Sequence, residues 1–164
     1  MSESRLNSKD NNSPDTNQKR AIILRGLPGS GKSHWVDTYL KSQGLEIATR
    51  VKQYGYFSTD SLFMVNGQYQ FDVSKLSQYH QHNLCGFIQA LGTREPLVIC
   101  DNTNVCHWEY AAYQMAAKAL GYQVKIVVIG DPKNSQHQSL CAERNRHGVP
   151  LGHIRKMAQL FELD

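Results

Sequence analysis

The chain has 164 residues, of which 40% are hydrophobic and 20% charged, a composition typical of a globular protein rather than of a disordered or membrane protein. Its formal net charge of +4 is too small to indicate nucleic-acid binding by itself. Four cysteines without a Cys-x-x-Cys pair, a polar N-terminus and apolar runs far shorter than a bilayer predict a reduced, cytoplasmic protein with no zinc site, redox motif or membrane contact.

Residues 1–19 are polar and nearly devoid of large apolar side chains, so we expect a flexible tail followed by a single domain over 20–164. Within that domain, apolar runs and turn residues predict strands and helices that alternate along the chain. The predicted strands are 21–26, 54–58, 97–100 and 124–129. The predicted helices are 33–43, a short one at 61–65, a long one capped by Asp72 or Ser74 and closed by Gly92, then 108–120, 134–145 and 151–163. Residues 45–60 are less regular than the rest of the domain, and Asn66-Gly67 predicts a turn.

This alternation predicts an α/β fold, with a parallel sheet of four to five strands and helices on both faces. In such sheets ligands bind beyond the carboxyl ends of the strands. The four predicted strands lead into the Gly26 loop, Asp60, Asp101 and Asp131. We therefore expect the chemistry of the protein to collect along this edge.

The first strand leads into a G-x-x-x-x-G-K-S motif that is followed by a predicted helix. Glycines let consecutive backbone N–H groups turn inward, and the helix adds its positive N-terminal end, which together suit the polyphosphate of a nucleotide. Lys32 would reach the β- and γ-phosphates, and the Ser33 hydroxyl would ligate Mg²⁺. The predicted nucleotide-binding residues are Gly26, Leu27, Pro28, Gly29, Ser30, Gly31, Lys32, Ser33 and His34.

Asp60 follows the second strand and is our candidate general base. Phosphoryl transfer to an alcohol needs a carboxylate within hydrogen-bond reach of the attacking hydroxyl. The structural alternative is that Asp60, or Thr59, caps the short helix that follows.

Asp101 follows the third strand, in the position of a carboxylate that holds Mg²⁺ directly or through water. Together with Asn102, Thr103 and Asn104 it forms a polar patch, and we predict that Asp101, Asn102 and Asn104 contribute to substrate binding. The structural alternative is an Asx turn with a helix cap.

Arg144 and Arg146 lie near the end of a predicted helix, before the segment 147–150 with its glycine and proline. A guanidinium on a mobile segment there would stabilise charge on the transferred phosphoryl group, with Arg144 the preferred residue. The alternative is a pair of solvated cations at a helix C-terminus. For His147 and His153 the sequence offers no acidic or cysteine partner at a spacing that suits a metal site, so we expect packing or surface roles rather than metal ligation. Trp35 and Trp108 are expected in the core or in a pocket wall.

Taken together, these segments resemble the polynucleotide-kinase-type P-loop kinases over residues 21–161. The matching stretches are the phosphate loop with His34 and Trp35, Thr59-Asp60, the run from Val98 to Asn104, and Arg144-Asn145 before Val149-Pro150. The resemblance implies a three-layer P-loop kinase fold and an enzyme that uses ATP and Mg²⁺, with Lys32 and Ser33 in the loop, Asp60 as base, Asp101 ordering the site and a lid arginine.

The sequence departs from this family at two positions. His34 stands where the family usually has threonine, and Phe63 stands where the enzyme acting on nucleic-acid ends has an arginine for the substrate phosphate.

The predicted function is transfer of the γ-phosphate of ATP to a hydroxyl, with the 5′-hydroxyl of a polynucleotide or nucleoside as first choice of acceptor. The first alternative is a small-molecule acceptor such as a sugar, an antibiotic or another metabolite. The second is a nucleotide-binding ATPase or switch without an acceptor, although no N-K-x-D or D-x-x-G motif of a GTPase follows the relevant strands.

Overall fold

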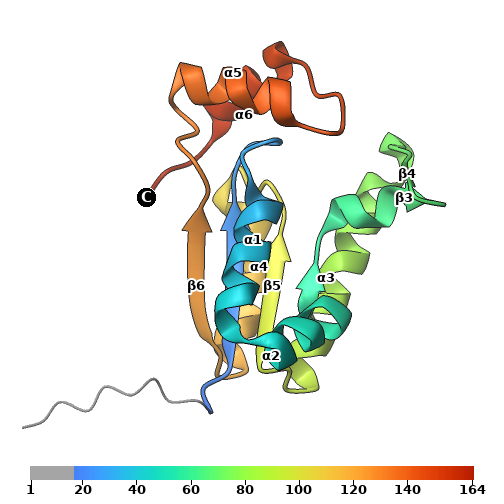
Figure 1. Cartoon of the computed structure of the whole chain (residues 1–164), viewed down its shortest axis with the longest axis vertical. Coiled ribbons are helices and arrows are strands. Elements are labelled where there is room, and N and C mark those ends of the chain that lie inside the picture. The colour runs from blue at the N-terminus through green and yellow to red at the C-terminus, as the bar shows by residue number, and fades with distance from the viewer. Residues whose placement is uncertain (1–16) are drawn as a thin grey trace, which may run out of the picture.

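The computed structural model describes residues 17–164. At its centre lies a four-stranded sheet of order β2-β5-β1-β6, in which every neighbouring pair is parallel (Figure 1). The strands are β1 (Arg20–Arg25), β2 (Tyr56–Phe57), β5 (Leu97–Asp101) and β6 (Gln123–Val128). The predicted α/β fold with a parallel sheet of four to five strands is therefore confirmed, and the described residues form four of them.

Helices cover both faces of this sheet, and two more lie beyond the tips of its strands (Figure 1). Their bounds are α1 (Lys32–Gln43), α2 (Leu45–Arg50), α3 (Leu76–Gly92), α4 (His107–Ala119), α5 (Ser135–Arg144) and α6 (Leu151–Leu160). Shorter segments are a π-helical turn (Val51–Gly55), 3₁₀ turns (Thr59–Phe63 and Val73–Lys75) and an antiparallel hairpin of β3 (Met64–Val65) and β4 (Gln68–Tyr69).

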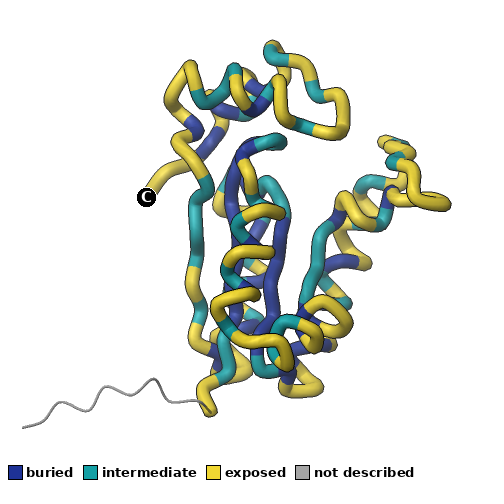
Figure 2. The backbone as a smooth tube through the Cα atoms, in the orientation of Figure 1, coloured by how far each residue is buried: buried dark blue, intermediate teal, exposed yellow. Residues whose placement is uncertain are grey.

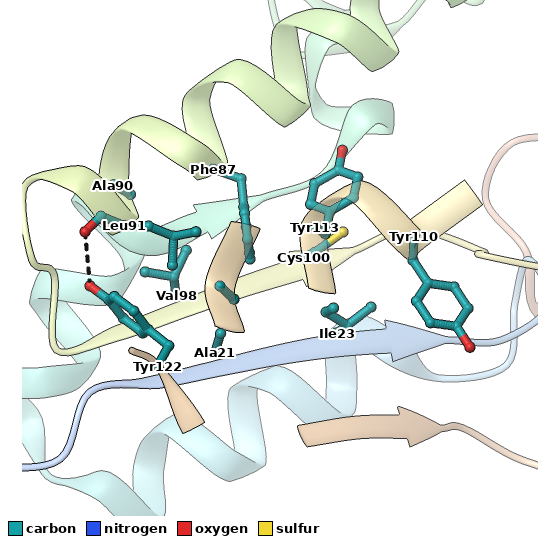
Figure 3. Close-up of a cluster of buried hydrophobic side chains, with 11 residues drawn as sticks. Ala21, Ile23, Phe87, Ala90, Leu91, Val98, Cys100, Tyr110, Tyr113 and Tyr122 are labelled. Atoms are coloured by element: carbon teal, nitrogen blue, oxygen red, sulfur yellow. Dashed lines mark hydrogen bonds between the residues drawn. The ribbon is translucent and has the colours of Figure 1, made fainter. Parts of the chain in front are cut away.

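The central strands are buried on both faces, and their side chains alternate between two cores. In β1, Ala21 and Ile23 join one cluster, whereas Ile22 and Leu24 join the other. The first cluster packs against α3 and α4, with Phe87 against the ring of Tyr113 (Figure 3). The second cluster packs against α1 and α2. Figure 2 shows the resulting contrast between buried β1 and β5 and the exposed outer surface of the helices.

A third cluster joins α5 and α6 to the carboxyl edge of the sheet. Its buried residues are Leu27, Val105, Cys141, Ile154, Ala158 and Phe161. Leu27 belongs to the loop after β1 and Cys141 to α5. The two C-terminal helices are thus packed onto the loops in which the sequence predicts the site.

The region between α1 and the second strand differs from the prediction. Residues 45–55 are helical, and the strand expected over 54–58 is limited to Tyr56–Phe57. A Cβ on Gly55 would lie 2.4 Å from the Leu97 carbonyl oxygen, so this glycine lets the helical turn approach β5 closely. The helix expected over 61–65 is a 3₁₀ turn over Thr59–Phe63, and the next residues enter the hairpin instead.

Other boundaries shift by a few residues. The last helix ends at Leu160 rather than at 163. Asp72 accepts a hydrogen bond from the backbone N–H of Ser74, so it caps the 3₁₀ turn that precedes α3. The tail predicted over 1–19 lies mostly outside the described residues, but the carbonyl of Lys19 accepts a hydrogen bond from Gln123 beside the sheet. In the described part of the chain, no helix has the length and apolar character needed to span a bilayer.

Candidate functional site

The loop between β1 and α1 closes around two glycines with positive φ angles. Gly29 has φ 79° and Gly31 has φ 101°, which L-residues with a Cβ rarely adopt. A Cβ on Gly29 would also lie 2.2 Å from the carbonyl oxygen of Cys141 in α5. The loop can therefore carry only glycine at position 29, because α5 is packed directly against it.

The side chain of Lys32 folds back over this loop. Its Nζ donates to the carbonyl oxygens of Gly26 at 3.1 Å and Leu27 at 3.2 Å. Burial lowers the pKa of Lys32, and the negative charges of Asp101 and Asp60 oppose that shift. The charges of both predicted carboxylates thus act on the predicted phosphate-binding lysine.

The same loop contains a buried hydroxyl with no hydrogen-bond partner. Ser30 is 8% exposed, and its Oγ is one of two buried side-chain polar atoms without a partner in the described chain. Leaving a buried hydroxyl unpaired costs about 1–3 kcal/mol, which an anion bound in the loop would relieve. The loop residues therefore fit a polyphosphate.

Tyr56, which sequence reasoning missed, connects the two predicted metal ligands. Its hydroxyl donates to Oδ2 of Asp101 and also interacts with the Ser33 side chain. The Tyr56 hydroxyl is thus next to both predicted metal ligands. Burial raises the pKa of Asp101, whereas Lys32 and the Tyr56 hydrogen bond lower it. These two oxygen donors, with phosphate oxygens and water, fit the ligand preference of Mg²⁺.

Asp60 lies in the 3₁₀ turn after β2, with its carboxylate exposed. The N-cap of this turn is Ser58, and no side chain caps it, which disfavours the helix-capping alternative for Asp60. The preceding residue, Thr59, is fixed on two sides. Its backbone N–H donates to Oδ1 of Asn102 at 2.9 Å, and its Oγ1 lies 3.1 Å from Nδ1 of His80.

Two aromatic side chains from other elements contact the Asp60 carboxylate. The Tyr69 hydroxyl of the hairpin lies 3.5 Å from Oδ1, and Nε2 of His147 lies 3.7 Å from Oδ2. The rings of Tyr69 and His147 pack with centroids 3.8 Å apart. Burial and the Asp60 charge raise the pKa of Tyr69 to about 12. The fold thus gives His147 an acidic neighbour from a distant segment, which spacing along the sequence does not reveal.

Arg144 and Arg146 are both exposed, and in residues 17–164 neither side chain makes a hydrogen bond or an ion pair. Arg144 is the last residue of α5, one turn after the Cys141 carbonyl that packs on Gly29. The Asn145 amide holds the next segment by donating to the Val149 carbonyl at 2.9 Å and accepting from the Val149 N–H at 2.8 Å. Both guanidinium groups are thus available to a ligand. The backbone between α5 and α6 is held by the two hydrogen bonds between Asn145 and Val149.

The remaining predicted residues divide between the site and the packing. Asn102 reaches the site through Thr59, as described above. Asn104 is 2% exposed and has a φ angle of 45°. Its Nδ2 donates to the Leu24 carbonyl at 2.7 Å, so this side chain links the segment after β5 to the end of β1. His34 is exposed on the first turn of α1. Pro28 is half-buried in the loop.

Comparison with known sequences identifies a family. The profile of the family described as AAA domain matches residues 22–163. NEDD4-binding protein 2 of Homo sapiens is 33% identical over 141 residues, which cover 86% of this chain and 8% of that protein. YLP motif-containing protein 1 of Mus musculus is 26% identical over 168 residues, covering 89% of this chain and 11% of that protein. The chain therefore spans about a tenth of the length of these relatives.

Solved structures share the fold at low sequence identity. A gluconokinase from Sinorhizobium meliloti 1021 superposes with a TM-score of 0.53 at 18% identity, over 88% of this chain and 75% of that one. A chain of the Pnkp1/Rnl/Hen1 RNA repair complex superposes with a TM-score of 0.59 at 16% identity, over 94% of this chain and 47% of that one. With its phosphate loop, its parallel sheet and the profile match over nearly all of the described residues, the chain belongs to the AAA-domain family and has a P-loop kinase fold.

Proposed function

We propose that the protein is an ATP- and Mg²⁺-dependent kinase that transfers the γ-phosphoryl group of ATP to a hydroxyl, with the 5′-hydroxyl of a polynucleotide or nucleoside as its acceptor. The observation that carries this proposal is that Asp60 follows β2 and Asp101 ends β5, at the same edge of the sheet as the loop that leads into Lys32, and that the charges of both carboxylates act on Lys32. A nucleotide holder alone needs only one of them. An exposed carboxylate beside the phosphate loop is what an attacking alcohol requires.

In this mechanism the residues divide the work. Lys32 and the loop N–H groups hold the phosphates, and the Asp60 carboxylate accepts the proton of the acceptor hydroxyl as its oxygen bonds to phosphorus. The bond between the γ-phosphorus and the bridging oxygen breaks, and ADP leaves. Mg²⁺, held by Ser33 and Asp101, would supply neutralisation of phosphate charge. Arg144, or Arg146, would contact the transferred group from the α5–α6 loop.

A small-molecule acceptor is the second candidate, favoured by the environment of Phe63. This side chain is 1% exposed and packs against the rings of Phe71 and Tyr79. Position 63 therefore offers no cation to a phosphate of a polynucleotide acceptor. We also propose that residues 20–164 act as one domain in the cytoplasm.

The proposal is tested by replacing the candidate base. We expect Asp60→Asn to lower phosphoryl transfer to 5′-hydroxyl oligonucleotides, nucleosides or small alcohols by about 10²–10⁴-fold, because a general base contributes a factor of that size. ATP binding should persist. Asp131→Asn is a matched control, since Asp131 is an exposed carboxylate after β6 whose Oδ1 accepts a hydrogen bond from the Lys133 N–H. Equal acceptor-dependent rates in the native protein and Asp60→Asn would remove Asp60 from the mechanism.

A further inference from the structure

A cavity of about 590 Å³ lies between α3 and α4, beside the carboxyl end of β5. This volume falls within the range of small-molecule sites, which is about 300–1,000 Å³. Its lining includes His80, Gln81, Asn102, Trp108 and Glu109.

This cavity adjoins the candidate base. His80 and Asn102 line it, and both contact Thr59, the residue before Asp60. Two residues that line the cavity thus contact the residue directly before the proposed proton acceptor. These two hydrogen-bond contacts link the cavity wall to the turn that carries Asp60.

The charges around the cavity disfavour an anion. Its lining includes no lysine or arginine. Its one carboxylate, Glu109, already accepts a hydrogen bond from the Cys106 N–H at 2.6 Å. Burying a phosphate here would set it beside a negative charge without a counter-ion, which is unfavourable. The cavity suits an uncharged group.

Its walls suit a flat ring. Trp108 lies in the first turn of α4 and is 77% exposed, so a large part of its indole is available for contact. Leu76, Leu84 and Ala112 supply apolar surface, and Asn102, Gln81 and His80 supply donors and acceptors. Aromatic surface combined with amide groups is the usual means by which proteins bind unpaired bases.

We propose that this cavity binds the nucleobase of the phosphate acceptor, with Trp108 as the stacking surface, and that acceptor selection rests on the base rather than on acceptor phosphates. This inference rests on the proposed kinase function. It deepens that function by naming an uncharged, base-bearing acceptor of the nucleoside type.

A fluorescence titration tests the cavity directly. The chain has two tryptophans, so Trp35→Phe leaves Trp108 as the reporter. Trp35 is itself stacked on Tyr39 in α1, away from the cavity. With the nucleotide loop filled by a non-hydrolysable ATP analogue, adenosine should change the Trp108 emission saturably, whereas ribose at the same concentration should not. Adenosine 3′-phosphate should bind no more tightly than adenosine.

Variant kinetics provide the second arm. Trp108→Ala should raise the KM for adenosine by about 5- to 150-fold, the factor expected for loss of one stacked base, with the KM for ATP unchanged. Trp108→Phe should retain most of the affinity because a ring remains, and Trp35→Ala should leave the adenosine KM unchanged.

The outcomes separate the two proposals. Adenosine binding that changes Trp108 emission without phosphate transfer would support the cavity and contradict the kinase. Phosphate transfer whose acceptor KM is indifferent to Trp108→Ala would support the kinase and overturn the cavity. Equal responses to ribose and adenosine, or a gain in affinity from the 3′-phosphate, would also overturn it.

Discussion

The hydroxyl of Tyr56 is the group at which the two proposed Mg²⁺ ligands meet. It donates to Asp101 and interacts with Ser33. Burial and the neighbouring Asp101 charge raise the pKa of Tyr56, so the hydroxyl keeps its proton throughout the physiological range. Asp101 therefore always has a donor that favours its ionised form.

Replacing Tyr56 by Phe should move the acid limb of the pH–rate profile. The pKa of Asp101 is raised by burial and partly lowered by the Tyr56 hydrogen bond. Without the hydroxyl this pKa rises further, so a larger fraction of Asp101 is protonated at a given acidic pH. We expect the acid limb of kcat/KM to shift to higher pH and the Mg²⁺ requirement to increase.

Tyr122→Phe is the control, because the Tyr122 hydroxyl donates to the Glu95 carbonyl away from the site. An unchanged acid limb in Tyr56→Phe would show that Asp101 ionisation does not limit the reaction.

Among the helices, α5 contacts the phosphate loop directly, and this contact determines which residues of the loop can be replaced. Gly29 and Gly31 both have positive φ angles, but their surroundings differ. A Cβ on Gly29 would meet the Cys141 carbonyl at 2.2 Å, whereas a Cβ on Gly31 would meet nothing within 4 Å. A substitution at Gly31 would therefore introduce backbone strain alone, whereas one at Gly29 would introduce both backbone strain and a clash with α5.

We expect Gly31→Ala to cost about 1–2 kcal/mol of unfolding free energy, the strain of a left-handed alanine. Gly29→Ala should cost more and weaken ATP binding, because α5 must move away from the loop. Denaturant unfolding and calorimetric titration with ATP measure both quantities. Equal losses in the two variants would mean that α5 does not press on the loop.

The braced α5–α6 loop links the two halves of the candidate site. Its His147 contacts Asp60 and the hairpin residue Tyr69, and its helix presses on the phosphate loop at Gly29. A movement of this loop would therefore alter the surroundings of the proposed base and of the phosphate cradle together. Arg144 and Arg146 would travel with it.

The reactivity of the four cysteines depends on how deeply each is buried, and therefore measures whether the protein is folded. Cys85 is exposed, whereas Cys100 and Cys141 are buried. Burial raises the pKa of Cys100 to about 12, so at pH 8 it is a protonated thiol. Burial also raises the pKa of Cys106, helped by Glu109 and Glu162.

We expect a thiol reagent at pH 8 to modify Cys85 first and Cys106 more slowly, because thiolate is the reactive form. Cys100 and Cys141 should react only as the protein unfolds. Mass spectrometry after timed quenching, with and without denaturant, gives the order. Modification of Cys100 at the rate of Cys85 would contradict the buried position of β5.

The sheet could be predicted from the sequence because β1, β5 and β6 are apolar runs bounded by glycine, proline or aspartate. The hairpin of β3 and β4 could not, since strands of two residues carry no periodic signal. The helical turn at 51–55 was missed for a related reason. It depends on the close approach of Gly55 to Leu97, which only the folded chain reveals.

The candidate site divides in the same way. Lys32, Asp60 and Asp101 could be proposed because each follows a strand, and parallel strands deliver their carboxyl ends to one edge. Tyr56, Tyr69 and His147 carry no such positional signal. Their relevance arises from contacts between segments far apart in the sequence, and their catalytic or positioning roles stay predictions.

One further contact joins the last residue of β1 to the end of the chain. Arg25 is fully buried, its guanidinium lies between the rings of Tyr110 and Phe161, and it donates to the carbonyls of Val105 and Glu162. Arg25 immediately precedes Gly26, the first residue of the nucleotide loop. Phe161 and Glu162 near the C-terminus therefore hold in place the residue from which this loop begins. Removing residues 161–164 would take away two contacts of the buried Arg25 guanidinium, next to the phosphate loop, although no proposed substrate contact involves these residues.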